Sequence, residues 1–265
     1  MKGVVSVRTW LVAAIALAAT VVFQLAMRAT GGDDSALGNV GQNTVISFAV
    51  AVMVWALGAL SVREPIGRQW AWLMSGSAMF LAGNIVWTYY ENGLDMGVPF
   101  PGVPDFFYLG MYPLLAIGVF SALLSFRKLF DLKPALLVAA VVCVAATVGL
   151  YFAVFQAIIA DPASDLLYKV ISMGYPVADI WLLLLPGIAL AITASRLGGG
   201  RIAWPWWCAV GGFVLIAVAD VFFNIATWNG TYQSGGLADS GWMLGFCALA
   251  VGASLVVDVQ KPREQ

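Results

Sequence analysis

The stretch PGVPDFFYLGMYPLLAIG (residues 101–118) passes from a proline-rich loop into an apolar helix, with one acidic residue, Asp105, at the junction. A carboxylate at the start of a helix accepts hydrogen bonds from free backbone N–H groups and faces the positive end of the helix dipole. Two partial echoes follow, DLLY from Asp165 and DSGW from Asp239. We therefore expect Asp105, Asp165 and Asp239 to cap three helices of a repeated unit.

The composition of the chain is that of an integral membrane protein. Of its 265 residues, 62% are hydrophobic and 10% are charged, and the mean hydropathy of +0.90 lies outside the range of soluble domains. Apolar runs long enough to cross a hydrocarbon core of about 30 Å fall at residues 10–27, 44–62, 69–90, 105–126, 134–156, 170–195, 203–227 and 239–258. The sequence predicts an all-α membrane protein with eight transmembrane helices in a single domain.

The basic residues predict the orientation, because Lys and Arg concentrate in cytoplasmic segments. Only Arg28 and Lys169 fall outside when the N-terminus is placed in the cytoplasm. The other basic residues fall inside, namely Lys2, Arg8, Arg63, Arg68, Arg127, Lys128, Lys133, Arg196, Arg201, Lys261 and Arg263. We expect both termini in the cytoplasm and a multi-pass location in a bacterial plasma membrane.

Internal matches divide the predicted domain into parts. AGNIVWTYYENG (82–93) resembles VADVFFNIATWNG (218–230), with Asn84 in the place of Asp220, and DFFYLGMY matches DSGWMLGF, with Tyr108 in the place of Trp242. These matches predict that the third and fourth helices superpose on the seventh and eighth. The expected parts are two N-terminal helices (1–68), three repeated hairpins of which the middle one is degenerate (69–133, 134–200 and 201–258), and a cytoplasmic tail (259–265).

Polar side chains inside the apolar runs mark a candidate site. A charged side chain at mid-bilayer costs about 2.5 to 3.5 kcal/mol on insertion scales, so it faces the bundle interior, is neutralised or has a partner. Asn84, Asp179 and Asp220 lie inside their runs. We expect them to line a ligand pocket in the outer half of the bundle beneath the 92–104 loop, with aromatic walls from Trp87, Tyr112, Tyr175, Trp181 and Phe223. The alternative is that these groups only link helices by hydrogen bonds.

The residue types limit the chemistry of such a pocket. The chain has no histidine, which excludes a His-ligated haem, a His-based zinc site and a Ser/His/Asp triad. We expect no metal, cofactor, catalytic residue or nucleic-acid partner. Two carboxylates among aromatic rings favour a small amine, through charge pairing and cation–π contacts, or a neutral amphiphile if the acids are protonated.

The segments VPFPGVPDFFYLGMYPLLAIG, YPVADIWLLLL and LADSGWMLGFCALAVGA, within residues 79–258, carry a family resemblance. Together they are similar to the N-terminal multi-helix membrane region of actinobacterial signalling proteins with cytoplasmic GGDEF and EAL domains. The resemblance implies a membrane sensor coupled to cyclic di-GMP turnover. The chain departs from that family at VVDVQKPREQ, which no output domain follows. The expected partners, besides the lipid bilayer, are therefore a cytoplasmic output domain or a second copy of the chain.

Three functions are compatible with these features. A sensory or ligand-binding membrane module is favoured by the resemblance and by the predicted outward pocket. A small transporter or channel that uses intramembrane carboxylates is the first alternative. An intramembrane lipid-modifying enzyme, with Asp179 and Asp220 as acid and base, is the second, and it requires metal ligands or a paired motif that the sequence lacks.

Overall fold

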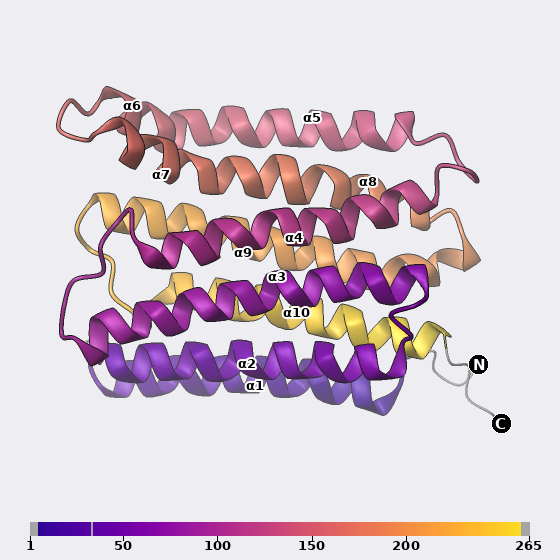
Figure 1. Cartoon of the computed structure of the whole chain (residues 1–265), viewed down its shortest axis with the longest axis horizontal. Coiled ribbons are helices and arrows are strands. Elements are labelled where there is room, and N and C mark those ends of the chain that lie inside the picture. The colour runs from indigo at the N-terminus through magenta and orange to yellow at the C-terminus, as the bar shows by residue number, and fades with distance from the viewer. Residues whose placement is uncertain (1–4, 33, 261–265) are drawn as a thin grey trace.

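The computed structural model describes residues 5–32 and 34–260, which form long helical rods lying side by side (Figure 1). No described residue lies in a β-strand. The rods are α1 (Val7–Ala29), α2 (Ser35–Ala59), α3 (Pro65–Thr88) with η1 (Tyr89–Gly93), α4 (Val103–Ser125), α5 (Lys133–Leu150) with η2 (Tyr151–Phe155) and α6 (Gln156–Ala160), α7 (Leu166–Ala178) with η3 (Asp179–Leu184) and α8 (Leu185–Ala194), η4 (Gly198–Ala203) with α9 (Trp204–Trp228), and α10 (Leu237–Gln260).

The rods have the length and composition of membrane-spanning helices. Across the residues that the structure describes, seven helical segments are long and apolar enough to cross a bilayer, which confirms the prediction of an all-α, multi-pass membrane protein. The helix α3 is long enough, with 24 residues, but it is not among the seven. Arg68, Gln69 and Asn84, together with several glycines and serines, lower its hydropathy.

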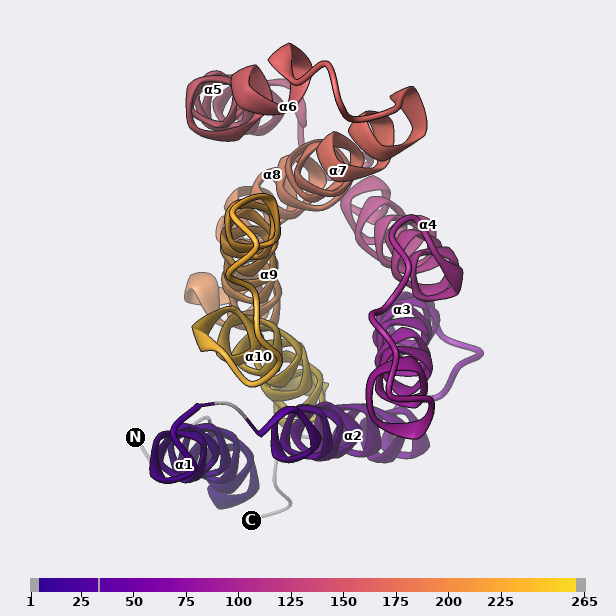
Figure 2. The same ribbon diagram turned by 90° about the vertical axis from the view of Figure 1, so that its left-hand side faces the viewer.

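The rods are arranged as a ring with two helices outside it. Viewed along the rods, the ring runs through α2, α3, α4, α7 with α8, α9 and α10, while α1 and α5 lie at its periphery (Figure 2). The α3–α4 hairpin therefore faces the α9–α10 hairpin across the ring, and α2 faces the α7–α8 rod. Around the ring, α2 separates the two hairpins on one side and the α7–α8 rod separates them on the other (Figure 2).

The α3–α4 and α9–α10 hairpins pack through glycines at matching places. A Cβ atom added to Gly118 of α4 would lie 2.9 Å from the carbonyl oxygen of Gln69 on α3. A Cβ atom added to Gly252 of α10 would lie 2.9 Å from the carbonyl oxygen of Pro205 on α9. Small residues at such positions let helix backbones approach closely in a membrane. The two hairpins therefore share a packing contact as well as a sequence pattern.

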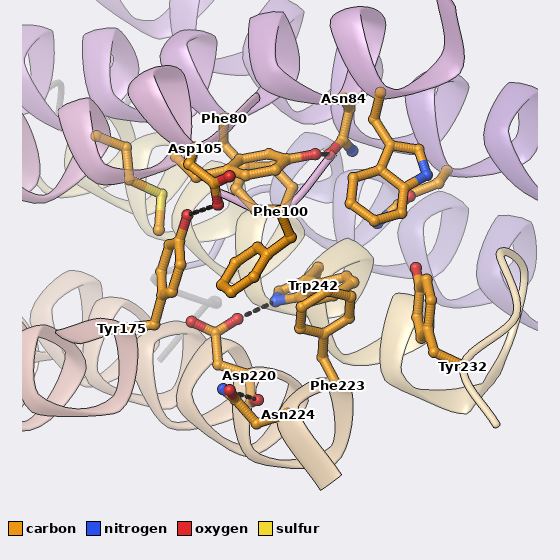
Figure 3. A pocket seen from close by; sticks show the side chains of 14 residues that line it. Phe80, Asn84, Phe100, Asp105, Tyr175, Asp220, Phe223, Asn224, Tyr232 and Trp242 are labelled. Carbon is orange, nitrogen blue, oxygen red and sulfur yellow. Dashed lines mark hydrogen bonds between the residues drawn. The ribbon is translucent and has the colours of Figure 1, made fainter. Parts of the chain in front are cut away.

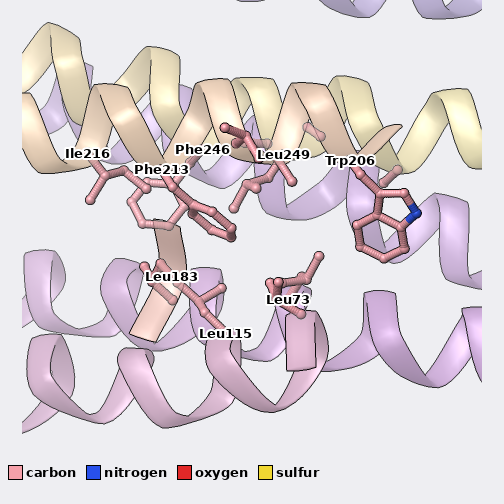
Figure 4. Packing of buried hydrophobic residues seen from close by; sticks show 14 of the residues in the cluster. Leu73, Leu115, Leu183, Trp206, Phe213, Ile216, Phe246 and Leu249 are labelled. Carbon is pink, nitrogen blue, oxygen red and sulfur yellow. The ribbon is translucent and has the colours of Figure 1, made fainter. Parts of the chain in front are cut away.

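Apolar side chains fill the middle of the ring. Trp70 of α3 stacks on Trp206 of α9, with ring centroids 5.3 Å apart. Side chains from opposing rods meet beside this pair (Figure 4), including the fully buried Leu73, Leu115, Leu183, Phe213, Ile216, Phe246 and Leu249. This cluster packs the opposite sides of the ring against each other.

The two ends of the bundle differ in charge. The loop end carries the connections 94–102 and 229–236, whereas at the terminal end Ser6 N donates to Asp258 Oδ2 over 2.9 Å. Only Arg28 and Lys169 among the described basic residues lie near the loop end. Those near the terminal end are Arg8, Arg63, Arg68, Arg127, Lys128, Lys133, Arg196 and Arg201. Lys2, Lys261, Arg263 and residues 261–265 of the predicted tail lie outside the described residues.

Candidate functional site

A cavity lies inside the ring near the loop end, between the α3–α4 and α9–α10 hairpins (Figure 3). The volume of the cavity is about 50 Å³. That volume holds about three to five waters. Gln42 of α2 and Tyr175 of α7 complete the wall, and Phe100 of the 94–102 loop also lines the cavity.

Most of the cavity wall is aromatic. The rings come from α3, α4, α7, α9, α10 and two loops, and they are Phe80, Trp87, Phe100, Tyr108, Tyr175, Phe223, Tyr232 and Trp242. Several contact one another, as Trp242 does with Phe80 and Phe223, at centroid distances of 5.9 and 5.6 Å. Such a wall presents ring faces to a ligand and encloses a small volume.

Asp220 of α9 is the more deeply placed of the two carboxyl groups that line the cavity. Its Oδ1 accepts a hydrogen bond from Trp242 Nε1 over 2.6 Å, and its Oδ2 accepts one from Tyr112 Oη over 2.9 Å. Only 7% of its surface is exposed. These two donors fix the carboxyl group at the cavity wall, and each of its oxygens keeps a second acceptor position.

Asp105 is the second carboxyl group of the wall, and it also completes the start of α4. Its Oδ2 accepts from Gly102 N over 2.7 Å, and its Oδ1 accepts from Tyr175 Oη over 2.5 Å. Asp105 occupies the third position of the helix rather than the N-cap. One residue therefore closes a helix end and presents an acid to the cavity.

The three predicted capping residues accept hydrogen bonds at helix starts in two different ways. Asp239 resembles Asp105, because it lies in the first turn of α10 and accepts from Gly235 N and from Tyr232 Oη. Asp165 instead occupies the N-cap of α7 and accepts from Tyr168 N over 2.7 Å.

Asp34 shows which helix start the Asp165 cap resembles. It caps α2 by accepting from Leu37 N over 2.9 Å, a bond from the third following residue like the one that Asp165 accepts at α7. The cap of α7 therefore resembles that of α2. The sequence echo had indicated a resemblance to the start of α4, where the acid lies inside the first turn instead.

Two side-chain amides in the wall have unused hydrogen-bonding capacity. Asn84 Oδ1 accepts from Tyr108 Oη over 2.8 Å, but Asn84 Nδ2 has no partner. Gln42 Nε2 also has no partner. Each residue is only 5% exposed, so neither amide group compensates by contact with bulk solvent.

Hydrogen bonds tie the rim of the cavity together at the loop end. Glu91 Oε2 in η1 accepts from Asn39 Nδ2, Trp87 Nε1 and Ser234 Oγ, over 2.6, 3.0 and 2.7 Å. Burial raises the pKa of Tyr232 in the neighbouring loop, and Asp239 raises it further. The Tyr232 hydroxyl therefore stays protonated and donates to Asp239. These bonds join α2, α3 and the 229–236 loop around the cavity mouth.

The structure brings most of the sequence-predicted site residues together. Asn84, Trp87, Tyr175, Asp220 and Phe223 line the cavity. Tyr112 lies behind the wall, where it orients Asp220.

Two other predicted site residues, besides Tyr112, do not line the cavity. Asp179 is fully buried next to Asp220 and Tyr112, with neither carboxyl oxygen hydrogen-bonded. Trp181 turns toward α5, where its Nε1 donates to Thr147 Oγ1 over 3.1 Å. The π-helical segment η3 begins at Asp179, shortly after Pro176. Trp181 follows Asp179 by two residues, so the two side chains leave the rod on nearly opposite sides.

Sequence reasoning missed several cavity residues, of which Asp105, Tyr108 and Trp242 are the most informative. The signal for them was present in the repeat. Tyr108 and Trp242 occupy matched positions, as do Asn84 and Asp220, and in the structure each aromatic residue hydrogen-bonds the polar residue of its own hairpin. Gln42 and Phe100 carried no comparable signal, because they come from segments without a repeat partner.

The lining residues define the chemistry that the cavity supports. No Lys or Arg is among the described residues that line it, so neither carboxyl group meets a basic side chain in the wall. Asp220 has the buried carboxyl group of Asp179 as a further neighbour. This environment suits a bound cation. Comparison of the chain with models of protein families, with curated proteins and with solved structures gave no match, so the assignment rests on the residues of the site.

Proposed function

We propose that the chain is a membrane-embedded sensory module that binds a small protonated amine in this cavity. The observation that carries the proposal is the presence of Asp105 and Asp220 in an aromatic cavity whose described lining residues include no Lys or Arg. A buried carboxylate without a cationic partner is costly, and an ammonium group would compensate it. Ring faces within reach attract the same group through their quadrupoles.

The proposed topology has eight spans with both termini in the cytoplasm, in a bacterial plasma membrane. The excess of basic residues near the terminal end supports this orientation, and the place of α3 within the ring supports counting it as a span. The cavity would then open toward the outer face. A reporter fused after Gln265 tests the orientation, and activity of a periplasmic reporter there contradicts it.

The helix α10 supplies a route from the cavity to the cytoplasmic side. Trp242, near its start, holds Asp220, while Ser254 and Asp258 near its end hold α1. Thr9 Oγ1 donates to Asp258 Oδ2 and lies 2.7 Å from Ser254 Oγ. A ligand that binds one position of α10 more tightly shifts the population toward it. The output would be a cytoplasmic domain for cyclic di-GMP turnover or a second copy, as the family resemblance implies.

Ethylamine is a suitable first probe because of its size. Three heavy atoms contribute at most about −4.5 kcal/mol, at about −1.5 kcal/mol per atom, which corresponds to a dissociation constant near 0.5 mM. At 50 mM, roughly 100 times that constant, binding stabilises the protein by at most about 2.7 kcal/mol. The rise in melting temperature is therefore at most about 5 to 10 °C. Ethanol and potassium chloride at the same concentration should give no such rise.

Matched carboxyl variants locate the effect. Asp220→Asn should remove the stabilisation by ethylamine, because the amide keeps the shape of the side chain but not its charge. Asp161→Asn is the control, since hydrogen bonds from Ser164 and Ala163 hold the pKa of this loop residue low and it is not in the cavity wall. Equal stabilisation of the wild type and Asp220→Asn would contradict binding at this cavity.

Hydrogen exchange separates sensing from binding alone. If α10 transmits binding, ethylamine should change amide exchange at residues 6–10 and 254–260 as well as around the cavity. Unchanged exchange at the terminal end, with saturable binding, would leave a binding protein without this transmission route.

A transporter is the second candidate, favoured by the two similar hairpins on either side of the cavity. Repeats related by an axis along the membrane normal are a known transporter architecture. Proteoliposomes loaded with a pH dye test it, because uptake of an amine down its gradient by a transporter would require Asp220. Binding without uptake favours the sensor.

A further inference from the structure

Two unpartnered amide groups of the cavity wall indicate a second feature of the ligand. Asn84 Nδ2 on α3 and Gln42 Nε2 on α2 have no hydrogen-bond partner, although both residues are buried and line the cavity. Buried polar groups in folded proteins nearly always have a partner. A polar group of the ligand would supply the missing one.

Asp220 and Asn84 lie on different sides of the cavity. Asp220 belongs to α9, whereas Asn84 and Asp105 belong to the α3–α4 hairpin and Gln42 belongs to α2. In Figure 3, Asn84 and Asp220 approach the cavity from opposite sides, with the ring of Trp242 beside Asp220. A ligand that satisfies both Asp220 and the amides therefore carries an ammonium group at one end and a hydrogen-bond acceptor at the other.

The cavity also limits the size and charge of that acceptor. Space for about three to five waters admits a ligand of about four heavy atoms. A carboxylate at the second end would be desolvated without a cationic side chain to pair with it, since no Lys or Arg is among the described lining residues. An uncharged hydroxyl group avoids this cost and accepts from either amide.

We infer that the preferred ligand of the cavity is a small amino alcohol, with two carbon atoms between its ammonium and hydroxyl groups. The ammonium group faces Asp220, and the hydroxyl oxygen accepts hydrogen bonds from Asn84 Nδ2 and Gln42 Nε2. This inference rests on the proposed function, because it names the class of amine that the same site prefers.

Ethanolamine and propylamine provide the direct test, because both have four heavy atoms and differ only in the terminal hydroxyl or methyl group. Binding to the purified full-length protein is measured by calorimetric titration at constant ionic strength. We expect ethanolamine to bind at least tenfold more tightly than propylamine, because the methyl group leaves the two amides unpaired. Glycine, which replaces the hydroxymethyl group with a carboxylate, should bind more weakly than both.

Variants of the amides assign the preference to its residues. Gln42→Met and Asn84→Leu should each reduce the preference for ethanolamine to about threefold or less while propylamine still binds. Gln42→Met decides the assignment if Asn84→Leu fails to fold, because Gln42 Nε2 has no hydrogen bond to lose. A tenfold preference that persists in Gln42→Met overturns the role of this amide.

The outcomes separate this inference from the proposed function. If propylamine binds the wild type as tightly as ethanolamine, or if glycine binds most tightly, the amino-alcohol inference is overturned and the amine site remains. If neither amine binds, the proposed function fails and the inference fails with it.

Discussion

The α3–α4 and α9–α10 hairpins have the same framework but differ in charge where they face the cavity. Tyr108 Oη donates to Asn84 Oδ1 in the first hairpin, and Trp242 Nε1 donates to Asp220 Oδ1 in the second, over 2.8 and 2.6 Å. An aromatic donor on the second helix therefore holds a polar side chain of the first helix in both. The shared bond is structural, whereas the change from amide to acid supplies the carboxyl group on which the proposed preference for a cation rests.

The same comparison extends to the backbone contacts. A Cβ atom on Gly76 would lie 3.1 Å from the Met111 carbonyl oxygen, and one on Gly212 would lie 2.6 Å from the Gly245 carbonyl oxygen. These contacts and those of Gly118 and Gly252 recur at matched places in the two hairpins. The close helix approach thus belongs to the framework and not to ligand recognition.

The largest expected effect comes from filling the tighter glycine contact. Gly212→Ala should lower the free energy of unfolding by about 3 kcal/mol, because the new methyl group meets a backbone oxygen that cannot move aside. Gly76→Ala should cost about 1 to 2 kcal/mol, since its nearest contact is the flexible end of Leu115. Reversible unfolding in detergent measures both.

Gly211→Ala is the matched control for this pair. A Cβ atom on Gly211 meets nothing within 4 Å, so alanine there should be neutral or stabilising by up to about 1 kcal/mol. A loss at Gly211 as large as that at Gly212 would show that helix flexibility, and not close packing, explains the glycines.

The next largest effect concerns the acids at the helix starts. Asp105→Ala and Asp239→Ala should each cost about 2 to 3 kcal/mol, because each loses a backbone hydrogen bond and a tyrosine hydrogen bond. Asp34→Ala and Asp165→Ala should cost about 1 kcal/mol, the usual value for a lost N-cap. If Asp165→Ala costs as much as Asp105→Ala, the start of α7 resembles that of α4, as the sequence echo indicated.

The smallest expected effect on stability comes from making the two polar pairs alike. Asp220→Asn gives α9 the amide that α3 has at Asn84, and the side chain can still accept from Trp242. We expect the free energy of unfolding without ligand to change by less than about 1 kcal/mol, because one hydrogen bond at most is lost. A loss of several kcal/mol would mean that the charge of Asp220 is part of the framework.

Much of the fold follows from the sequence, because the apolar runs indicate long membrane-crossing helices and the order of the basic residues along the chain indicates which end of the bundle carries them. The repeat, in which Asn84 matches Asp220 and Tyr108 matches Trp242, also contained all four residues of the two main polar pairs of the site. The sequence did not show that Tyr108 hydrogen-bonds Asn84 or that Trp242 hydrogen-bonds Asp220, because the two residues of each pair lie far apart along the chain.

Other parts of the site were predicted wrongly or carried no periodic signal. Trp181 follows Asp179 by two residues, which is about 200° around a helix of 3.6 residues per turn, so the two side chains do not line one wall. Phe100 enters the cavity from a loop, whose path the sequence does not specify. The sequence did not indicate that α2 and α7 begin with similar caps, because different residues surround Asp34 and Asp165.

The most direct test of a cation site on the α9–α10 side is a fluorine NMR titration of protein labelled with 5-fluorotryptophan. The Trp242 resonance, assigned through Trp242→Phe, reports on the ring that holds Asp220, and exposed Trp72 on α3 is the internal reference. We predict that ethanolamine shifts the Trp242 resonance saturably and leaves Trp72 unchanged, and that Asp220→Asn abolishes the shift. A Trp242 resonance that does not respond in the wild type, or that responds equally in Asp220→Asn, would contradict the account.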